Sequence, residues 1–327
     1  MKINLSELRD VTKKAIISYG YTPREAEIVM KVLLYAQLRD NNQGIVKLIG
    51  NGIPKREDGQ LPTIVKETPV SALVDGNKTH AIIVMDQLAD LAIEKAKKIG
   101  VGIAGNFNTK ESTGALGYYV NKVAEAGLIG LAFAAAPFQT TAPHGSTEAL
   151  FCTNPLAYGI PTETDPILLD MSTSKMAYYG LIEAKTAGKQ IPEGVGYDEN
   201  GNPTTDPAAI MGGALKTIAG RKGSGLAMVV QILAGAFVGA DSFDDDSVNA
   251  GNLVIAIDPN IFVPSAEFQS RVSAIGKKVK SARKHETIKE ILLPGERGNN
   301  LTKSRLESGE IEIEDNLYKQ LKIVAGV

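Results

Sequence analysis

Hydrophobic positions recur at helical spacing through the first forty residues. The stretch LSELRDVTKKAIISYG predicts a helix that closes at Gly20. Thr22, Pro23 and Glu25 then combine capping-box spacing with a proline at the first helical position, which predicts a second helix running to about Arg39. A pair of helices therefore opens the chain.

Short apolar runs alternate with amphipathic segments through the middle of the chain. SALVDG and THAIIV predict strands, and MDQLADLAIEKAKKIG predicts a helix that ends at Gly100. Later strands are predicted at VGIAGNF, LIGLAFAAA, NPLAYGI and PILLDM, and later helices at YYVNKVAEAG, SKMAYYGLIEAKTAG and GSGLAMVVQILAGAFVGA. This alternation indicates an α/β region that extends to roughly residue 290. The segment beyond it ends in a short amphipathic helix, EDNLYKQLKIV.

Composition places the chain among globular proteins and narrows its class. Its 327 residues predict either one large, interrupted domain or two lobes around a cleft. Hydrophobic residues make up 43% and charged residues 22%, which argues against long disordered stretches. The net charge is −2, and lysine and arginine are spread along the chain and not clustered. The sequence therefore predicts no basic surface that would bind nucleic acid.

The compartment is predicted from the start of the chain and from its cysteine content. MKINLSELRDVTKKA is charged and helical rather than an apolar signal core, and no stretch of about 18 uncharged apolar residues follows. We therefore expect a protein that is neither secreted nor membrane-spanning. The single cysteine, Cys152, excludes an intrachain disulfide and fits a reducing compartment, so a cytoplasmic location is predicted.

The string from Gly100 to Gly105 matches the G-x-G-x-x-G pattern of dinucleotide-binding proteins. That fingerprint needs a strand before the glycines and a helix after them, so that the pyrophosphate meets a helix N-terminus. Here a predicted helix ends at Gly100 and a predicted strand follows. We therefore interpret these glycines as a helix stop.

Two strand-to-helix junctions are better candidates for an anion site. The first leads from the apolar run PILLD into a predicted helix through Asp170, Met171, Ser172, Thr173, Ser174 and Lys175. Free backbone N–H groups, the helix dipole and a lysine can together hold a phosphate there, although simple N-capping explains the same residues. The second junction places Arg221 and Lys222 before two glycines at the start of GLAMVVQILAG. Two such junctions in one lobe favour a nucleotide site.

Neither a metal site nor a hydrolase motif is predicted. His80, His144 and His285 stand far apart without ligand spacing, and we expect His80 and His285 at the surface. The acidic loop DSFDDDSVNAG lacks the spaced glycine and closing glutamate of a calcium loop, so it is interpreted as a solvated connector. Cys152 lies among apolar residues and is interpreted as a small buried hydrophobe rather than a nucleophile. No Gly-x-Ser-x-Gly elbow occurs.

Across nearly its full length the chain resembles the type-2 malate/L-lactate dehydrogenase family of NAD(P)-dependent oxidoreductases. The resemblance rests on TNPLAYGIP, LLDMSTSKMAYYG, AGKQIPEG, YDENGNPTTDP, RKGSGLAM and LLPGERG, whose order and spacing are most similar to the 2,3-diketo-L-gulonate reductase branch. It implies an α/β fold with a non-Rossmann nicotinamide-binding lobe, residues 71–290, built on a largely antiparallel or mixed sheet. It also implies a helical substrate and dimer lobe, formed by residues 1–70 and 291–327, and an interdigitated homodimer.

The resemblance assigns roles to residues of this chain, motif by motif. Its three cofactor segments correspond to Asp170 through Met176, to Arg221 and Lys222, and to Gly295 and Glu296. Asp198 in YDENG matches a carboxylate that partners the family's catalytic histidine, and Thr153 matches a substrate-side position. The implied cofactor is NADH or NADPH, between which the sequence does not decide. The implied substrate is a small keto or imino acid.

Departures from the family pattern bear on the chemistry. The family carries Ser-His-Gly followed three residues later by arginine, whereas this chain has Asn42, Gln43 and Gly44 and then Lys47. Gln43 therefore replaces the acid/base histidine, and Lys47 replaces the arginine that clamps the substrate carboxylate. A second family histidine, in an Asn-His pair, corresponds to Thr109.

The missing histidine leaves three hypotheses. Glutamine donates a hydrogen bond but exchanges no proton at neutral pH, and losing an acid/base group typically removes about 10²–10⁴-fold in rate. In the first hypothesis another group supplies the proton for 2-oxo-acid reduction, with Lys47, Lys222 and His144 as candidates. In the second, the substrate is a cyclic imine that enters already protonated. In the third, the chain is a weakly active or inactive nucleotide-binding homologue.

Overall fold

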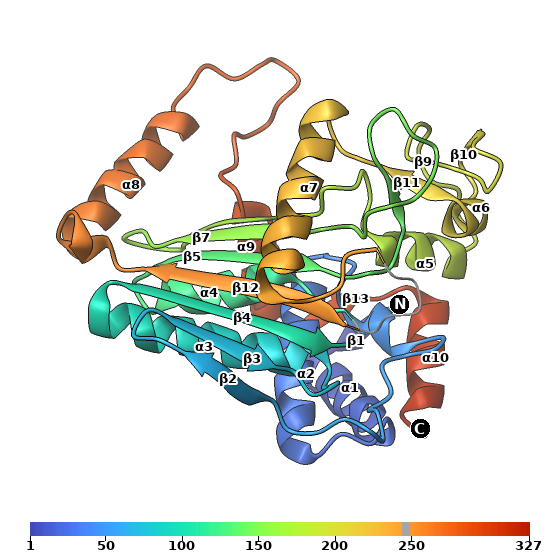
Figure 1. The fold of residues 1–327 in the computed structure, drawn as a ribbon. Coiled ribbons are helices and arrows are strands. Elements are labelled where there is room, and N and C mark those ends of the chain that lie inside the picture. The colour runs from blue at the N-terminus through green and yellow to red at the C-terminus, as the bar shows by residue number, and fades with distance from the viewer. Residues whose placement is uncertain (111, 244–248) are drawn as a thin grey trace.

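The chain folds around a central sheet, with a smaller sheet and helices packed against it (Figure 1). The computed structural model describes residues 1–110, 112–243 and 249–327. In spatial order, the central strands are β2 (Thr63–Glu67), β3 (Ser71–Asp75), β4 (Val101–Thr109), β12 (Ala250–Ile257), β5 (Ile129–Ala135), β7 (Leu156–Ile160) and β8 (Ile167–Met171). Neighbouring strands run antiparallel except β3 and β4, so the prediction of a mixed, largely antiparallel sheet is confirmed.

Helices and two smaller β structures complete the fold. The helices are α1 (Leu5–Ser18), α2 (Pro23–Leu38), α3 (Ala81–Ile99), α4 (Leu116–Glu125), α5 (Tyr178–Thr186), α6 (Pro207–Gly212), α7 (Arg221–Ala234), α8 (Ser265–Lys280), α9 (Glu296–Ser308) and α10 (Asp315–Val324), with 3₁₀ turns η1 (Ile45–Leu48), η2 (Ala236–Val238) and η3 (Pro259–Ile261). The small sheet has the order β10 (Pro203–Thr204), β9 (Gly196–Tyr197), β11 (Ala214–Lys216) and β6 (Thr141–Ala142). A separate ribbon pairs β1 (Lys2–Asn4) with β13 (Glu310–Glu312).

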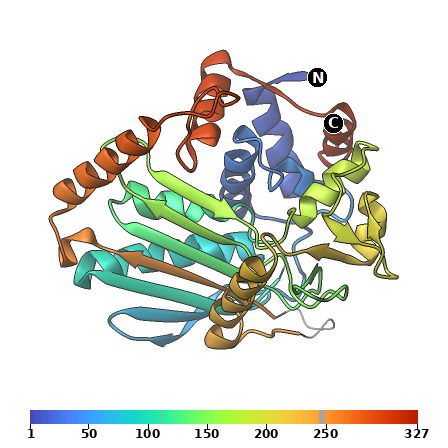
Figure 2. The ribbon, with the colours of Figure 1, turned by 90° about the horizontal axis from the view of Figure 1, so that it is seen from above.

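The two faces of the central sheet are covered unequally. α3 and α4 pack along one face, and α7 crosses the other over β5 and β12 (Figure 2). Glycines in the strands let α3 and α4 approach the sheet closely. A Cβ at Gly102 in β4 would lie 1.9 Å from the carbonyl oxygen of Ala92, and one at Gly159 in β7 would lie 2.2 Å from that of Val120. Burying the apolar faces of these helices stabilises the layer by roughly 25 cal/mol per Å².

The glycines of the G-x-G-x-x-G string end α3 and allow helices to pack closely on β4. Gly100 is the C-cap of α3 and has a φ of 91°, in the left-handed region that favours glycine. Gly102 lies against α3, and a Cβ at Gly105 would lie 2.7 Å from the Val238 side chain. The strand follows the glycines and the helix precedes them, so the predicted helix stop is confirmed.

Two predictions near the start of α3 are wrong: THAIIV is not a strand, and His80 is not at the surface. His80 is 6% exposed and caps the helix, because its Nδ1 accepts a hydrogen bond from the Ile82 N–H at 3.2 Å. The cap and the burial of the next apolar residues outweigh their β-branched character. Desolvation, followed by the charge of Lys47, lowers the pKa of His80 to about 3, so its ring is neutral.

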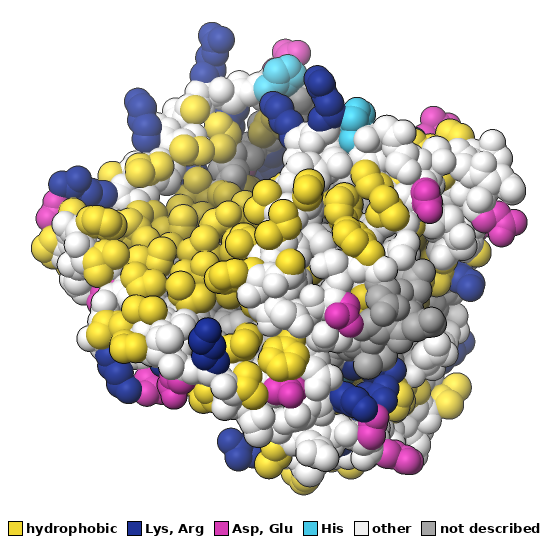
Figure 3. Space-filling view, in the orientation of Figure 1, with side chains coloured by type: hydrophobic (Ala, Val, Ile, Leu, Met, Phe, Trp, Pro, Cys, Tyr) yellow, Lys and Arg dark blue, Asp and Glu magenta, His cyan; other side chains and the backbone are white. Residues whose placement is uncertain are grey.

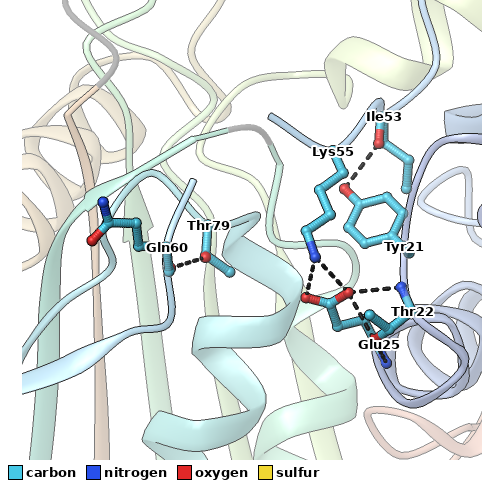
Figure 4. A network of polar contacts seen from close by, with 7 residues as sticks. All are labelled: Tyr21, Thr22, Glu25, Ile53, Lys55, Gln60 and Thr79. Atoms are coloured by element: carbon cyan, nitrogen blue, oxygen red, sulfur yellow. Dashed lines mark hydrogen bonds and ion pairs between the residues drawn. The ribbon is translucent and has the colours of Figure 1, made fainter. Parts of the chain in front are cut away.

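The capping box predicted at the start of α2 is confirmed, and its glutamate also binds a later loop (Figure 4). Thr22 Oγ1 accepts from the Glu25 N–H, and the Glu25 carboxylate accepts from the Thr22 N–H at 2.8 Å. Lys55 Nζ lies 2.8 Å from both oxygens of the same carboxylate. The Tyr21 hydroxyl donates to the Ile53 carbonyl oxygen at 2.9 Å. These contacts tie the loop after η1 to α2.

The N- and C-terminal segments lie side by side (Figure 1). β1 pairs with β13, α10 packs against α1, and the predicted C-terminal helix is confirmed. One continuous hydrophobic cluster joins these helices to α3 and α4. The division into a lobe of residues 1–70 with 291–327 and a lobe of residues 71–290 stays a prediction. The small sheet has its own cluster, which includes Leu181 of α5, Ile210 of α6 and Leu215 of β11.

Candidate functional site

A cavity of about 740 Å³ lies where loops of the central sheet meet the loop after α2. Its wall includes residues 40–43, 112–116 and 177–179, together with the end of β8 and the start of β12. Binding pockets for small molecules and cofactors typically measure about 300–1,000 Å³. The cavity brings together several of the predicted site residues, namely Gln43, Thr153, Asp170, Met171 and Ser172.

Gln43 and Lys47 meet through Ser112. Lys47 Nζ donates to Ser112 Oγ at 2.6 Å, and Ser112 Oγ donates to Gln43 Oε1 at 3.5 Å. Asn41 holds the start of this loop, because its Oδ1 accepts from the Gln43 backbone N–H at 2.9 Å. Lys47 lies one 3₁₀ turn further along, in η1.

Lys47 lies behind the cavity wall. Its side chain is almost completely buried, with the residue 1% exposed, and Nζ lies 3.3 Å from the ring centroid of Tyr179. A cation this close to a ring face makes a favourable cation–π contact. Gln43, Ser112 and Tyr179 all line the cavity, whereas Lys47 does not. Its positive charge therefore acts on the cavity through these neighbours.

Asp170, the last residue but one of β8, lies in the cavity wall and also caps a helix. Its Oδ2 accepts from the Gly117 N–H at 2.9 Å, at the start of α4, where the N-cap residue Ala115 offers no side-chain acceptor. Burial raises the pKa of Asp170 to about 6, while the Gly117 N–H acts in the opposite direction. The carboxyl group therefore titrates close to neutral pH.

The predicted junction after β8 does not lead directly into a helix. α5 begins at Tyr178, several residues later, and its N-cap Ala177 makes no side-chain cap. Between them, Ser174 forms a β-bridge with Thr217, and the Lys175 N–H donates to the Lys216 carbonyl oxygen at 2.8 Å. The prediction that these hydroxyl residues start the helix is therefore wrong, because this stretch pairs with the end of β11.

The hydroxyl groups of this stretch are largely satisfied internally. Thr173 and Ser174 are buried; Thr173 Oγ1 donates to the Thr153 carbonyl oxygen at 3.0 Å and Ser174 Oγ to that of Met176 at 2.6 Å. Ser172 Oγ donates to the Ser174 carbonyl oxygen at 2.9 Å. Of the three hydroxyl residues, Ser172 lines the cavity. It is therefore the one placed to contact a bound molecule.

The second predicted junction forms, but outside the cavity wall. α7 begins at Arg221, and both Arg221 and Lys222 are exposed. His144 is also exposed near this helix start, and its backbone N–H donates to Ser224 Oγ at 3.1 Å. Neither Lys222 nor His144 lines the cavity. Of the three candidate proton donors, Lys47 alone is linked to the cavity wall, through Ser112.

The third predicted cofactor segment reaches the cavity through a residue that sequence reasoning missed. Gly295, with a φ of 88°, precedes α9, and a Cβ there would lie 2.8 Å from the Leu168 side chain. Glu296 is paired with Lys280, which holds the pKa of its carboxyl below the usual range. The next residue, Arg297, lines the cavity. Because Arg297 is exposed and follows the predicted segment directly, its charge is accessible to an anionic ligand.

Asp198 and Thr153 occupy different regions. Thr153 lines the cavity. Asp198 lies in the turn between β9 and β10, where its Oδ1 accepts from the backbone N–H groups of Asn202 at 2.8 Å and Asn200 at 2.9 Å. Asn202 is the main cause of the lowered pKa of Asp198. Since Asp198 does not line the cavity, the structure does not bring it to Gln43.

Thr109, at the position of the family's second histidine, starts a directional chain of side chains. Its Oγ1 donates to the Ala250 carbonyl oxygen at 2.8 Å, Asn106 Nδ2 donates to Thr109 Oγ1 at 3.0 Å, and Asn252 Nδ2 donates to Asn106 Oδ1 at 2.9 Å. Because a carbonyl oxygen only accepts, the chain fixes the orientation of both amides. Asn252 lines the cavity, and because its Nδ2 donates to Asn106, its other side-chain polar atom, Oδ1, is an acceptor.

Sequence reasoning missed Ser112, Asn252 and Tyr179 as well as Arg297. Tyr179 and Arg297 lie within the motifs LLDMSTSKMAYYG and LLPGERG, but no role was assigned to them there. Ser112 and Asn252 belong to no quoted motif and reach the cavity only after distant segments pack together. Cys152 also lines the cavity, but burial raises the pKa of its thiol, which disfavours the thiolate.

The remaining sequence predictions concern a metal site, the acidic loop, a membrane-spanning segment and His285. Within residues 1–110, 112–243 and 249–327, His, Cys, Asp and Glu form no group of three or more that is arranged to hold a metal. Residues 244–248 of the acidic loop predicted to be a connector lie outside these ranges. No helix in the described part of the chain is long and apolar enough to cross a membrane. His285 is exposed, as predicted.

Comparisons with known proteins agree over the full length. A profile of the family described as malate/L-lactate dehydrogenase matches residues 3–322. A malate/(S)-sulfolactate dehydrogenase from Methanothermus fervidus is 33% identical, covering 99% of this chain and 97% of that protein. A ureidoglycolate dehydrogenase (NAD(+)) from Escherichia coli is 30% identical, covering 98% and 95%. Among solved structures, the delta1-piperideine-2-carboxylate reductase from Pseudomonas syringae is 26% identical, with a TM-score of 0.80 and 99% of each chain covered.

Proposed function

The chain belongs to the malate/L-lactate dehydrogenase family, and from this premise we propose that it reduces a small 2-oxo acid to the 2-hydroxy acid in the 740 Å³ cavity. It is an NAD(P)-dependent oxidoreductase, as its relatives are. The observation that carries the proposal is the composition of one wall: Gln43 and Ser112, backed by Lys47, share the cavity with the end of β8.

The cavity fits a nicotinamide dinucleotide. Its wall combines small and aromatic side chains, such as Ala135 and Tyr178, with the polar groups of Ser172 and Asn252 and the cation of Arg297. The reduced cofactor supplies a hydride when bound. Within the cavity we assign its binding to Asp170, Met171, Ser172 and Arg297. We propose that Arg221 and Lys222 contact the cofactor beyond the cavity wall, from the exposed start of α7, and that Thr173 through Met176, Gly295 and Glu296 hold the adjoining segments in place.

The substrate assignment follows from charge at the reacting group. As a carbonyl carbon gains hydride, its oxygen becomes negative, and a nearby cation or hydrogen-bond donor lowers the barrier. Gln43 supplies an amide, Ser112 a hydroxyl and Lys47 a positive charge behind them. Thr153 lies on the substrate side of the cavity in this assignment. A 2-oxo acid uses all of these groups.

A cyclic imino acid is the second candidate substrate. The observation in its favour is the likeness to the delta1-piperideine-2-carboxylate reductase over the full chain. An iminium ion already carries its proton, so the reaction needs no acid at the position of Gln43. The carbonyl oxygen of Asn252 could accept a hydrogen bond from an iminium N–H.

A substrate screen tests the proposed function. Purified protein is mixed with NADH or NADPH and with oxaloacetate, sulfopyruvate, pyruvate or Δ1-piperideine-2-carboxylate, and cofactor absorbance is followed. Turnover of a 2-oxo acid at about 10 s⁻¹, typical of enzymes, is the expected result. Turnover of the imino acid alone would establish the second candidate. Cofactor binding by calorimetry without turnover of any substrate would contradict both.

We further propose that the enzyme is a homodimer in the cytoplasm. Apolar side chains gather over the sheet between α7 and α8 (Figure 3). Exposed apolar residues on the bordering elements include Met228, Ile232, Ile275 and Leu169, and contiguous apolar patches commonly mark protein interfaces. The family resemblance and this surface support the dimer, and the single Cys152 supports a reducing compartment. Sedimentation of a monomer at micromolar concentration would contradict the dimer.

A further inference from the structure

We propose that Ser112 is the residue that gives a proton to the substrate oxygen, and that the buried ammonium of Lys47 replaces that proton. This inference rests on the proposed reduction of a 2-oxo acid. It addresses the group that substitutes for the acid/base residue replaced by Gln43. The three polar side chains of Lys47, Ser112 and Gln43 form a line from behind the wall to the cavity.

The hydrogen bonds fix the direction in which Ser112 donates. A lysine ammonium has donors and no acceptor, so Lys47 must donate to Ser112 Oγ across their separation of 2.6 Å. The Gly114 N–H donates to the same oxygen at 3.3 Å. A hydroxyl has two acceptor sites and one proton. With both acceptor sites engaged, the Ser112 proton must point elsewhere, toward Gln43 or the cavity.

The bond from Ser112 to Gln43 is weak enough to exchange. Its length of 3.5 Å lies beyond the usual range for a hydroxyl donor, about 2.5–3.0 Å. A substrate oxygen beside Ser112 can therefore take the place of Gln43 Oε1 as acceptor. When Gln43 Oε1 does accept from Ser112, the amide NH₂ of Gln43 is left to donate to the substrate. The two residues then act on the same small molecule.

The proton transfer balances with the hydride that the reduced nicotinamide supplies. As hydride reaches the substrate carbon, the carbonyl π pair moves to oxygen, and a new O–H bond forms there while the Ser112 O–H bond breaks. A proton then passes from Lys47 Nζ to Ser112 Oγ, which restores the hydroxyl and leaves a neutral amine. Solvent reprotonates Lys47 after the alcohol is released. The oxo acid is reduced and the dihydronicotinamide is oxidised.

The burial of Lys47 fits a residue that returns a proton to Ser112 better than a residue that contacts the substrate directly. Its residue exposure is 1%, and the ring of Tyr179 covers Nζ on one side. Ser112 stands between Nζ and Gln43, and it lines the cavity while Lys47 does not. Ser112 is therefore the proposed catalytic residue, and Lys47 acts through it.

The test compares Ser112→Ala, Ser112→Thr and the control Ser281→Ala. Ser281 is an exposed serine at the end of α8, outside the cavity wall, and its Oγ donates to the Lys278 carbonyl oxygen at 2.9 Å. Oxaloacetate or sulfopyruvate, whichever the wild type reduces faster, and Δ1-piperideine-2-carboxylate are the substrates. Circular dichroism checks folding, and calorimetry measures NADH affinity independently of turnover.

We expect Ser112→Ala to lower kcat for the oxo acid by about 10²-fold or more, as for other acid/base groups. KM, NADH affinity and any imino-acid turnover should stay within about twofold, a factor worth only about 0.4 kcal/mol. Ser112→Thr should restore kcat to within about tenfold of wild type, because it keeps the hydroxyl, and Ser281→Ala should match wild type.

The outcomes that contradict the role of Ser112 differ from the outcome that contradicts the proposed function. An unchanged kcat in a folded Ser112→Ala variant would overturn the proton-donor role while leaving the proposed function intact. Equal losses on oxo and imino acids, or no recovery with threonine, would show that Ser112 acts only structurally and would also overturn it. A wild type that reduces neither 2-oxo acid would contradict the proposed function itself.

Discussion

Two carboxylates predicted for the site show how differently the fold treats similar residues. Asp170 lies at the end of β8, where Gly117 from a distant helix donates to it, and burial raises its pKa to about 6. Asp198 lies in the turn after β9, where its partners Asn200 and Asn202 come from the same turn and its pKa is lowered. The first is part of a cavity assembled from distant segments, and the second stabilises a local turn.

The same contrast separates the other candidate catalytic residues. Gln43 and Lys47 are linked through Ser112 from another segment, whereas His144 is exposed beside the start of α7. A polar residue held by contacts across the fold in a cavity wall has an environment that can tune its chemistry. A residue in an exposed turn, such as Asp198, takes its partners from neighbouring residues and stays in contact with solvent. The following changes test this distinction, from the largest expected effect to the smallest.

Lys47→Met should have the largest effect. Methionine has a similar length and can fill the buried site without a charge. If Lys47 supplies protons through Ser112, kcat for a 2-oxo acid should fall by about 10²–10⁴-fold with little change in KM. Steady-state kinetics separate this from the alternative prediction that Lys47 clamps the substrate carboxylate. A large rise in KM at constant kcat would favour the clamp.

Asp170→Asn should alter the pH dependence of stability. A native pKa of about 6, above the unfolded value, means that the native state binds more protons between about pH 4 and pH 6. The wild type should therefore lose unfolding free energy as pH rises through that window. Asparagine keeps an acceptor for Gly117 but carries no charge, so we expect it to be more stable above pH 6 by about 1–3 kcal/mol.

Urea unfolding of both proteins at pH 4 and pH 7.5 measures this effect. The variant's advantage should be present at pH 7.5 and largely absent at pH 4, since the wild-type carboxyl is then protonated in the native state. A difference of the same size at both pH values would mean that packing, and not ionisation, distinguishes the two proteins.

Local signals allowed much of the fold to be predicted from sequence. The capping box at Thr22 and the helix stop at Gly100 depend on neighbouring residues, and both are confirmed. The predicted surface position of His80 is wrong because its burial depends on packing against Tyr21, a contact between distant segments. Family resemblance located Gln43 and Lys47, but nothing in the sequence around Ser112 indicates that it lies between them.

Gln43→His should have a smaller effect, an increase in oxo-acid kcat of about tenfold, because imidazole can exchange protons near neutral pH. Asp198 does not reach this position, so the Ser112 hydroxyl is the neighbour available to orient the ring. Imino-acid turnover should change less, since its substrate needs no added proton. Assays from pH 5 to pH 9 with one substrate of each kind measure the difference. Equal effects on both would show that position 43 does not handle the proton.

Asp198→Asn should have the smallest effect. Asparagine retains an oxygen that can accept from the backbone N–H groups of Asn200 and Asn202, so the turn should survive. Because Asp198 lies outside the cavity wall, kcat and KM for the oxo acid should both stay within about twofold, a change worth about 0.4 kcal/mol. The same assay on Lys47→Met provides the contrast. A loss of tenfold or more in kcat would mean that the turn between β9 and β10 moves into the catalytic site during turnover. Asp198 and Asp170 would then both act in catalysis, and they would differ only in when each reaches the site.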